Sequence, residues 1–141
     1  MRGLADRCIV VTGAGSGIGR AIARDFAEAG DQVTISGRRL DALQETDGGR
    51  GMILRAGDVT DEDQVKALFE TPFDVVIANA GSAGSKPVAK TSLAEWQGTL
   101  DVCLTGVFLT FREALQGMQP GGRLVAVASI ASLQGGANIA A

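Results

Sequence analysis

Apolar residues occur in five short runs along the chain, and most of these runs are nearly continuous rather than alternating with polar residues. This pattern is typical of strands in a parallel sheet that is covered on both faces. The runs span residues 8–13, 32–37, 51–59, 73–81 and 122–129. We therefore expect five strands of one parallel sheet.

The segments between these runs carry apolar residues at helical spacing. Gly30 is an expected C′ residue at the end of the first helix, and Ser92 with Glu95 predicts a capping box at the start of the last one. The expected helices span residues 21–29, 40–45, 62–70 and 93–118. Strands that alternate with helices predict a doubly wound α/β fold with right-handed crossovers. We expect residues 1–141 to form a single domain of this kind.

Composition excludes several classes of function. Apolar residues make up 45% and charged residues 21%, and the net charge of −3 is spread along the chain without a basic patch for nucleic acid. No apolar run approaches the ~20 residues needed to cross a bilayer, and we expect no signal peptide. The two cysteines, Cys8 and Cys103, show no metal or redox spacing, so we expect a cytoplasmic protein without a metal site. The absence of histidine excludes Ser-His-Asp chemistry.

Glycine is about twice as frequent as its usual share of roughly 7%, and four glycines occur from the last residue of the first predicted strand, Gly13, to Gly19, just before the first predicted helix. In a doubly wound fold this turn faces the ligand crevice, and the helix N-terminus that follows favours phosphate. The G-x-G-x-x-G fingerprint fails because Ile18 stands at the third glycine position, whereas Gly13, Gly17 and Gly19 fit G-x-x-x-G-x-G. A glycine turn without a ligand is the alternative, but it does not explain this placement.

Four motifs follow one another along the chain: TGAGSGIG at 12–19, GDVTD at 57–61, NAG at 79–81 and GRLVAVASIAS at 122–132. In order and spacing they resemble the short-chain dehydrogenase/reductase (SDR) family over the whole chain. The resemblance implies a Rossmann sheet in the strand order 3-2-1-4-5, followed in the family by two more strands. It also implies an NAD(P)-dependent oxidoreductase that transfers a hydride reversibly between a nicotinamide cofactor and a carbonyl or alcohol.

The resemblance assigns cofactor-binding roles to three segments: a pyrophosphate cradle, an adenine contact and a segment under the cofactor ribose. In that order they are Gly13, Ser16, Gly17, Ile18 and Gly19; Asp58 and Val59; and Asn79, Ala80 and Gly81. Two alternatives stay open at this point. Asn79 also braces the sheet in this family, and Asp58 is also a candidate N-cap or turn residue.

The end of the second predicted strand bears on the choice of cofactor. An NAD site places Asp or Glu about 20 residues after the glycine loop, for the ribose 2′-OH. Here that position is Gly37, followed by Arg38 and Arg39, while Asp41 falls in the next predicted helix. A guanidinium pairs well with a 2′-phosphate. We therefore expect NADP bound by Arg38, with NAD as the alternative and ordinary solvated arginines as the simpler interpretation.

The resemblance also implies the catalytic groups. Ser129 is expected to bind the carbonyl oxygen, with Ser132 as the runner-up. The position of the family's helical asparagine holds Cys103, whose thiol is a weak substitute for an amide, and we expect a buried cysteine that acts as a small apolar residue. The family's tyrosine, with a lysine four residues later, would follow directly after Ala141. We therefore expect an N-terminal part of a longer enzyme that is inactive by itself.

The expected partners are a small carbonyl or alcohol substrate, whose identity the sequence does not reveal, and further copies of the protein. The resemblance implies a dimer or tetramer packed through the long helix. Gly106 and Ala114 would permit close approach there, although ordinary helix packing explains them as well. No nucleic acid or membrane partner is expected. The alternative function is a non-catalytic nucleotide-binding or regulatory member of the family, which the cysteine at position 103 and the missing tyrosine support.

Overall fold

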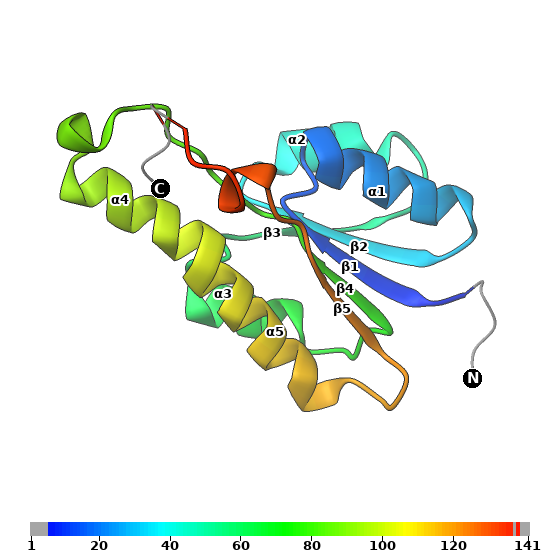
Figure 1. The fold of residues 1–141 in the computed structure, drawn as a ribbon. Helices are drawn as coiled ribbons and strands as arrows, with labels where there is room; N and C mark the ends of the chain where they lie inside the picture. The colour runs from blue at the N-terminus through cyan, green and yellow to red at the C-terminus, as the bar shows by residue number, and fades with distance from the viewer. Residues whose placement is uncertain (1–5, 137, 139–141) are drawn as a thin grey trace.

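Five parallel strands form the centre of the molecule (Figure 1). The computed structural model describes residues 6–136 and 138. The strands lie side by side in the order β3-β2-β1-β4-β5, so the expected fold class and strand order are both confirmed. The strands are β1 (Cys8–Thr12), β2 (Gln32–Gly37), β3 (Ile53–Ala56), β4 (Val75–Ala78) and β5 (Arg123–Ala126). Most are shorter than the apolar runs that predicted them, because the ends of those runs leave the sheet as loops.

The central strand β1 shows why its sequence is continuously apolar. Ile9 and Val11 are buried in one cluster, together with Val33 and Ile35 of β2. Val10, which lies between them in sequence, is buried in a second cluster on the opposite face. Because both faces of the strand are covered, its central positions are all apolar.

Helices cover both faces of the sheet (Figure 1). One face is covered by α1 (Gly17–Glu28) and α2 (Leu40–Asp47), and the other by α3 (Glu62–Leu68) and α5 (Gly106–Gly117). Leu43 of α2 is packed in the first apolar cluster, whereas Leu68 of α3 and Ala114 of α5 belong to the second. The helices thus supply one outer layer on each side of the sheet.

Helix α1 ends as its sequence predicts, with Gly30 as the C′ residue. Gly30 adopts a φ of 89° and donates its N–H to the carbonyl of Ala27, while the N–H of Asp31 bonds to the carbonyl of Phe26. This pair of bonds is a Schellman motif, in which glycine at C′ takes the left-handed conformation.

The long helix expected over residues 93–118 consists of three consecutive segments. They are α4 (Leu93–Leu100), a π-helical turn η2 (Asp101–Thr105) and α5. The predicted capping box between Ser92 and Glu95 is present at the start of α4. The π turn was not predicted, and such turns are frequent at functional sites.

Two small residues of α5 pack inside this chain rather than facing outward. A Cβ on Gly106 would lie 2.8 Å from Cγ2 of Val59, in the loop after β3. Ala114 is buried in the cluster between α5 and the sheet. Ordinary helix packing, the alternative interpretation of these two residues, therefore accounts for them.

Strand β5 forms one edge of the sheet and pairs with β4, as expected for residues 122–129. A short 3-10 helix, η3 (Ile130–Ser132), follows it. Within the part of the chain that the structure describes, no helix combines the length and apolar character needed to cross a membrane.

Candidate functional site

A cleft of about 870 Å³ opens beside the loops that follow β1, β2, β3 and β4. Its position is at the carboxyl ends of the strands where the chain crosses over in opposite directions, which is where open α/β sheets bind ligands. Every residue predicted to bind the cofactor lines this cleft: Gly13, Ser16, Gly17, Ile18, Gly19, Arg38, Asp58, Val59, Asn79, Ala80 and Gly81. The fold thus brings together four segments that are far apart in sequence.

Two glycines of the turn allow the backbone to pass close to β4. A Cβ on Gly13 would lie 2.6 Å from the Cα of Ala80, and one on Gly19 would lie 2.4 Å from Nδ2 of Asn79. Neither distance is compatible with a side chain, so these positions require glycine for packing. Gly13 also has a φ of 65°.

Gly17 differs from these two glycines. Its φ is 54°, and a Cβ placed on it would have no atom within 4 Å. Because Gly17 also lines the cleft, the missing side chain leaves space that belongs to the cleft rather than to the protein core.

Helix α1 begins at Gly17, four residues before the expected Ala21, so Gly17, Ile18 and Gly19 form its first turn. The N–H groups of a first turn have no acceptor inside the helix. The N-cap residue, Ser16, is extended and forms no side-chain cap bond to them. The helix therefore presents uncapped N–H groups and the positive end of its dipole at the cleft, which suits an anion.

Asn79, the residue directly after β4, hydrogen-bonds to the start of the turn after β1, and we call residues 13–19 the glycine turn. Its Nδ2 donates to the carbonyl oxygens of Thr12 (3.0 Å) and Gly13 (3.2 Å). The buried hydroxyl of Thr12 in turn accepts the backbone N–H groups of Asn79 (3.1 Å) and Ala80 (3.2 Å). Asn79 therefore braces the sheet, as one of its two interpretations holds, and it also lines the cleft. The contribution of Thr12 was missed, because a threonine at a strand end carries no distinctive signal.

The end of β2 brings two arginines to the cleft. Gly37 and Arg38 line it together with Arg39, the N-cap residue of α2. Within the described residues, the guanidinium of Arg38 forms no hydrogen bond or ion pair. Asp41, the nearest acid in sequence, lies in the first turn of α2. This corner of the cleft therefore offers a cation and open space where an NAD site would place a carboxylate.

Asp58 lies in the turn after β3. Its Oδ1 accepts the backbone N–H of Thr60 (3.0 Å) and the Thr60 hydroxyl (2.9 Å), so the interpretation of Asp58 as a turn residue is confirmed. The N-cap of α3 is Asp61, whose side chain accepts the N–H of Gln64. That bond and a second one from the Gln64 side chain lower the pKa of Asp61. Asp58 is thus a turn residue that also lines the cleft, and it is not the cap.

Cys103 lies in the π turn, and the prediction that it is buried is wrong. The residue is exposed, and its sulfur contacts both backbone groups of Ser82, in the loop after β4. The Ser82 N–H lies 3.4 Å from Sγ, and Sγ lies 3.2 Å from the Ser82 carbonyl oxygen. The thiol therefore acts as both acceptor and donor, and it ties the long helix to the rim of the cleft.

Ser129 follows β5 and is the N-cap residue of η3. Its Oγ accepts the N–H of Ala131 at 3.1 Å, and the residue is exposed. It is not among the described residues that line the large cleft. The side chain of Ser132, the runner-up, lies outside the described part of the structure. The predicted catalytic serine is thus set apart from the predicted cofactor residues.

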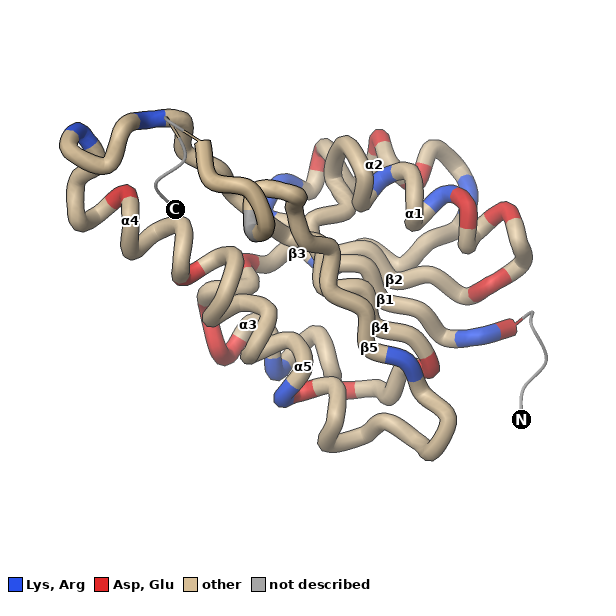
Figure 2. Tube along the Cα trace, in the orientation of Figure 1, with Lys and Arg blue, Asp and Glu red and all other residues tan. Residues whose placement is uncertain are grey.

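A smaller cavity of about 280 Å³ adjoins the cleft, between the loop after β4 and α4. Ser82 and Gly98 line both spaces. An ion pair between Lys86 and Glu95 crosses this cavity. The Lys86 ammonium, followed by two bonds from Ser92, lowers the pKa of Glu95 to about 2. Elsewhere, charges of both signs lie along α1 and α2, whereas the segment after β5 carries no charged residue (Figure 2).

Comparison with known proteins agrees with this geometry. A family model described as short chain dehydrogenase matches residues 7–141. A cis-4-hydroxycyclohexanecarboxylate dehydrogenase of Sinomonas cyclohexanicum is 40% identical, over 95% of this chain and 59% of the relative. A 3beta-hydroxysteroid dehydrogenase of Mediterraneibacter gnavus is 38% identical, over 92% of this chain and 52% of the relative. The chain therefore spans little more than half the length of these two relatives.

Solved structures share the fold. A short-chain dehydrogenase/reductase of Brucella melitensis, described as a glucose/ribitol dehydrogenase, superposes with a TM-score of 0.92 at 27% identity, over 99% of this chain and 64% of the other. A protein of Beutenbergia cavernae described as an NAD(P)-dependent gluconate 5-dehydrogenase was solved with bound NADP at low occupancy. It has a TM-score of 0.87 at 36% identity, over 97% of this chain and 59% of the other.

Proposed function

This chain belongs to the short-chain dehydrogenase family, and from that premise we propose that its cleft binds NADP(H) for hydride transfer to or from a carbonyl or alcohol substrate. The observation that carries the proposal is the first turn of α1, where uncapped N–H groups and the open space beside Gly17 meet at the cleft. The bound cofactor supplies or accepts the hydride. The residues of this chain bind and orient it.

The pyrophosphate belongs at the start of α1. Ser16, Gly17, Ile18 and Gly19 would hold it through backbone N–H groups, because a phosphate satisfies several such donors at once and is favoured by the helix dipole. Gly13 contributes indirectly, since its lack of a side chain lets the turn approach Ala80. A side chain at Gly17 would fill the space that the phosphate needs.

The remaining cofactor contacts are proposed from the segments around this turn. Asp58 and Val59 would border the adenine, and the stretch from Asn79 to Gly81 would lie under the ribose; all of them line the same cleft. One oxygen of Asp58 is engaged by Thr60.

We propose NADP(H) rather than NAD(H) because of the corner formed by Gly37 and Arg38. An exposed guanidinium with no partner among the described residues is suited to a 2′-phosphate. A Beutenbergia cavernae protein of this fold carries NADP, which supports the same choice. NAD remains the alternative cofactor, since an exposed arginine also tolerates a cofactor without the phosphate.

For the substrate side we propose Ser129 as the group that hydrogen-bonds the carbonyl oxygen. Its hydroxyl has one proton to donate and already accepts a bond from Ala131. The names of the two curated relatives both describe hydroxylated ring compounds, which supports alcohol and ketone chemistry for this protein as well.

Two further properties are proposed on the same basis. The protein is expected to work in the cytoplasm, since Cys8 and Cys103 are not joined in a disulfide.

The protein is also expected to form a dimer or tetramer through the long helix, because Leu104, Phe108 and Leu115 are large apolar residues exposed along it.

A second candidate function is nucleotide binding without catalysis. The observation that favours it is the thiol at position 103, where the family has an asparagine. The two functions differ in one result: an enzyme oxidises NADPH with some member of a panel of ketones, whereas a regulatory protein binds NADPH tightly and turns over none of them.

The main proposal is tested by comparing two glycines that share their backbone conformation. Gly17 and Gly49 both have positive φ, and both would leave a new Cβ without a neighbour within 4 Å, but only Gly17 lines the cleft. Gly17→Val is expected to raise the Kd of NADPH and NADH by ~100-fold or more, because the valine side chain would prevent the phosphate from hydrogen-bonding to several N–H donors. Gly49→Val should leave both constants unchanged. Calorimetric titration measures the constants, and thermal melting shows whether both variants fold; equal NADPH affinity in the two folded variants would contradict the proposal.

A further inference from the structure

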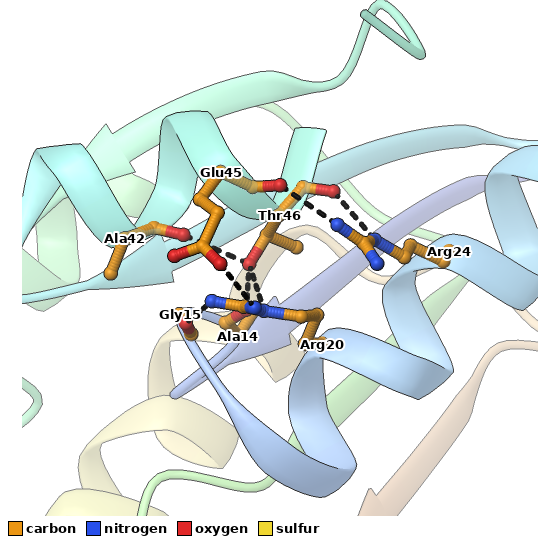
Figure 3. A network of polar contacts seen from close by, with 7 residues as sticks. All are labelled: Ala14, Gly15, Arg20, Arg24, Ala42, Glu45 and Thr46. Carbon is orange, nitrogen blue, oxygen red and sulfur yellow. Dashed lines mark hydrogen bonds and ion pairs between the residues drawn. The ribbon is translucent and has the colours of Figure 1, made fainter. Parts of the chain in front are cut away.

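Thr46, near the C-terminus of α2, lies beside Ala14 and Gly15 of the glycine turn (Figure 3). Its side chain is fully buried. Its Oγ1 lies 2.8 Å from the carbonyl oxygen of Ala14 and 2.9 Å from that of Ala42, and it accepts the Nε–H of Arg20 at 3.1 Å. The hydroxyl has one proton, so its donation is shared between the carbonyls of Ala14 and Ala42. The bond to Ala42 is the common one between a helical threonine and the carbonyl four residues before it. The bond to Ala14 instead connects α2 to the turn after β1.

Arg20, in the second turn of α1, extends this connection. Besides Thr46, its guanidinium contacts Oε1 of Glu45 at 2.9 Å and the carbonyl oxygen of Gly15 at 2.7 Å. Figure 3 shows the three acceptors arranged around one guanidinium. The contact with Arg20 also lowers the pKa of Glu45. The rigid fork of an arginine is suited to holding several acceptors in fixed directions.

These contacts fix the carbonyl groups of the turn. The carbonyl of Ala14 is directed at Thr46 and that of Gly15 at Arg20, while the N–H of Ala14 bonds to the carbonyl of Ser36 at the end of β2. In a trans peptide the C=O and the next N–H point in opposite directions. The N–H groups of Gly15 and Ser16 are therefore directed away from the network, and both of these residues line the cleft.

A glycine turn needs such a restraint. Glycine has access to many backbone conformations, so a peptide beside Gly15 can rotate and turn its carbonyl oxygen toward the cleft. A carbonyl oxygen there would repel a phosphate and would remove one of its donors. The restraint on the carbonyls of Ala14 and Gly15 comes from side chains, because neither carbonyl accepts a backbone N–H among the described residues.

We propose that Arg20 and Thr46 are positioning residues for the phosphate cradle: they hold the carbonyls of Ala14 and Gly15 so that the N–H groups of the turn face the cofactor. The inference rests on the proposed function, since it takes a pyrophosphate as the ligand of this turn. Neither residue contacts the ligand in this account. Arg20 is not among the described residues that line the cleft, and each of its three guanidinium nitrogens already donates one hydrogen bond inside the network.

Arg24 provides a matched control on the same helix. It lies one turn after Arg20, and it also binds α2, by donating to the carbonyl oxygens of Thr46 (3.0 Å) and Glu45 (2.8 Å). None of its hydrogen bonds reaches the glycine turn. Loss of Arg24 therefore weakens the contact between α1 and α2 without releasing the carbonyls of Ala14 and Gly15.

The experiment measures two ligands by calorimetry on the protein at its full natural length. ADP carries a pyrophosphate but no 2′-phosphate, whereas 2′-AMP carries a 2′-phosphate but no pyrophosphate. Thr46→Val, which removes the hydroxyl, is expected to raise the Kd of ADP about tenfold, the size of one lost bond to a charged ligand. The Kd of 2′-AMP should change less than about twofold. Thr46→Ser, which keeps the hydroxyl, should restore the affinity for ADP.

Arg20→Lys separates geometry from charge. The lysine keeps the positive charge but cannot hold three acceptors as the arginine fork does. Arg20→Lys is therefore expected to raise the Kd of ADP by about the same factor as Thr46→Val. Arg24→Met should lower the melting temperature and leave the Kd of ADP within about twofold of wild type. If Thr46→Val does not fold, as judged by circular dichroism, the comparison of Arg20→Lys with Arg24→Met decides.

The possible failures are distinguishable. A wild-type protein that binds neither ADP nor NADPH overturns the proposed function and this inference with it. A wild-type protein that binds ADP, with the same affinity in the folded Thr46→Val and Arg20→Lys variants, overturns this inference alone. Equal losses for ADP and 2′-AMP, or for Arg20→Lys and Arg24→Met, would mean that the network supports only the fold, and this also overturns it.

Discussion

The glycine turn after β1 and the segment after β5 lie beside strands of the same sheet, but they are held in different ways. The turn is fixed by partners far away in the sequence, including Ser36, Thr46 and Asn79. After β5, the hydroxyl of Ser129 bonds to an N–H two residues later, and the neighbouring Ile130 and Leu133 are exposed by 67% and 82%. The first region is thus built by the tertiary fold, whereas in the second the N–H groups of Ala131, Leu133 and Gln134 bond to Ser129 and Ile130, close by in the sequence.

This difference separates two roles. A site that must hold a charged ligand benefits from donors fixed in advance, because their ordering does not have to be achieved during binding. The turn after β1 meets that condition with contacts from β2, α2 and β4. We therefore expect changes in the first region to alter cofactor binding, and changes at Ser129 to alter turnover alone.

The largest effect is expected from placing a side chain at Gly19. A Cβ there would lie 2.4 Å from Nδ2 of Asn79 and 2.6 Å from the carbonyl oxygen of Gly13. Gly19→Val should lower the free energy of unfolding by roughly 3 kcal/mol, the upper range for overpacking. Gly135→Val is the control in the second region, since a Cβ at Gly135 has no neighbour within 4 Å. Urea unfolding of the two variants measures the difference, and equal stabilities would show that the turn is not closely packed.

The next effect concerns Ser129. If this hydroxyl binds the carbonyl oxygen, Ser129→Ala should lower kcat by ~100-fold, the scale for losing one preorganised donor. The Kd of NADPH should stay within about twofold of wild type, because Ser129 lies outside the cleft. Steady-state kinetics with a ketone substrate and calorimetry on the same preparation test both parts. A variant that loses NADPH affinity would remove the separation between the two regions.

Arg38→Ala is expected to act on one cofactor only. Loss of a charge-assisted contact to the 2′-phosphate is worth ~1.5–3 kcal/mol, so the Kd of NADPH should rise by about 10- to 150-fold. The Kd of NADH should stay constant. Arg123→Ala removes the same charge at the start of β5 and should change neither constant. Equal losses for NADPH and NADH would refute the role of Arg38 in cofactor choice.

The smallest effect is expected at Cys103, where the sulfur bonds to both backbone groups of Ser82. Cys103→Asn should preserve or raise the turnover rate, because an amide can also both donate and accept. A valine side chain neither donates nor accepts a hydrogen bond. Cys103→Val should therefore lower the turnover rate, but only a few-fold, because a neutral hydrogen bond contributes little net free energy. If both variants have the same rate, the link between the π turn and the loop after β4 has no bearing on catalysis.

Much of the fold could be predicted because parallel strands and amphipathic helices leave strong local patterns. Buried strands such as β1 and β4 are nearly all apolar, and glycine at position 30 marks a helix end. The start of α1 was placed four residues late because glycine has a low helix propensity, yet Gly17 and Gly19 lie in its first turn. The π turn was missed because the apolar spacing continues through it.

The residues that line the cleft were predicted well, whereas their supports were not. Motif spacing leads directly to the turn after β1 and to the segment from Asn79 to Gly81. Arg20 and Thr46 each lie one residue outside a predicted helix, and nothing in the sequence marks them, because only the packing of α1 against α2 makes Thr46 buried. The bonding of Cys103 to Ser82 was likewise hidden, because it depends on where the π turn places the thiol.

The most direct test of the account is hydrogen–deuterium exchange of the backbone amides with and without saturating NADPH. The N–H groups of Gly17, Ile18 and Gly19 have no acceptor within their own helix, so they are expected to exchange fast in the free protein. NADPH should slow their exchange and that of residues 79–81, while residues 123–126 keep their free rates. Protection confined to other segments, or none at the glycine turn under conditions where NADPH is bound, would contradict the claim that this turn holds the cofactor phosphates.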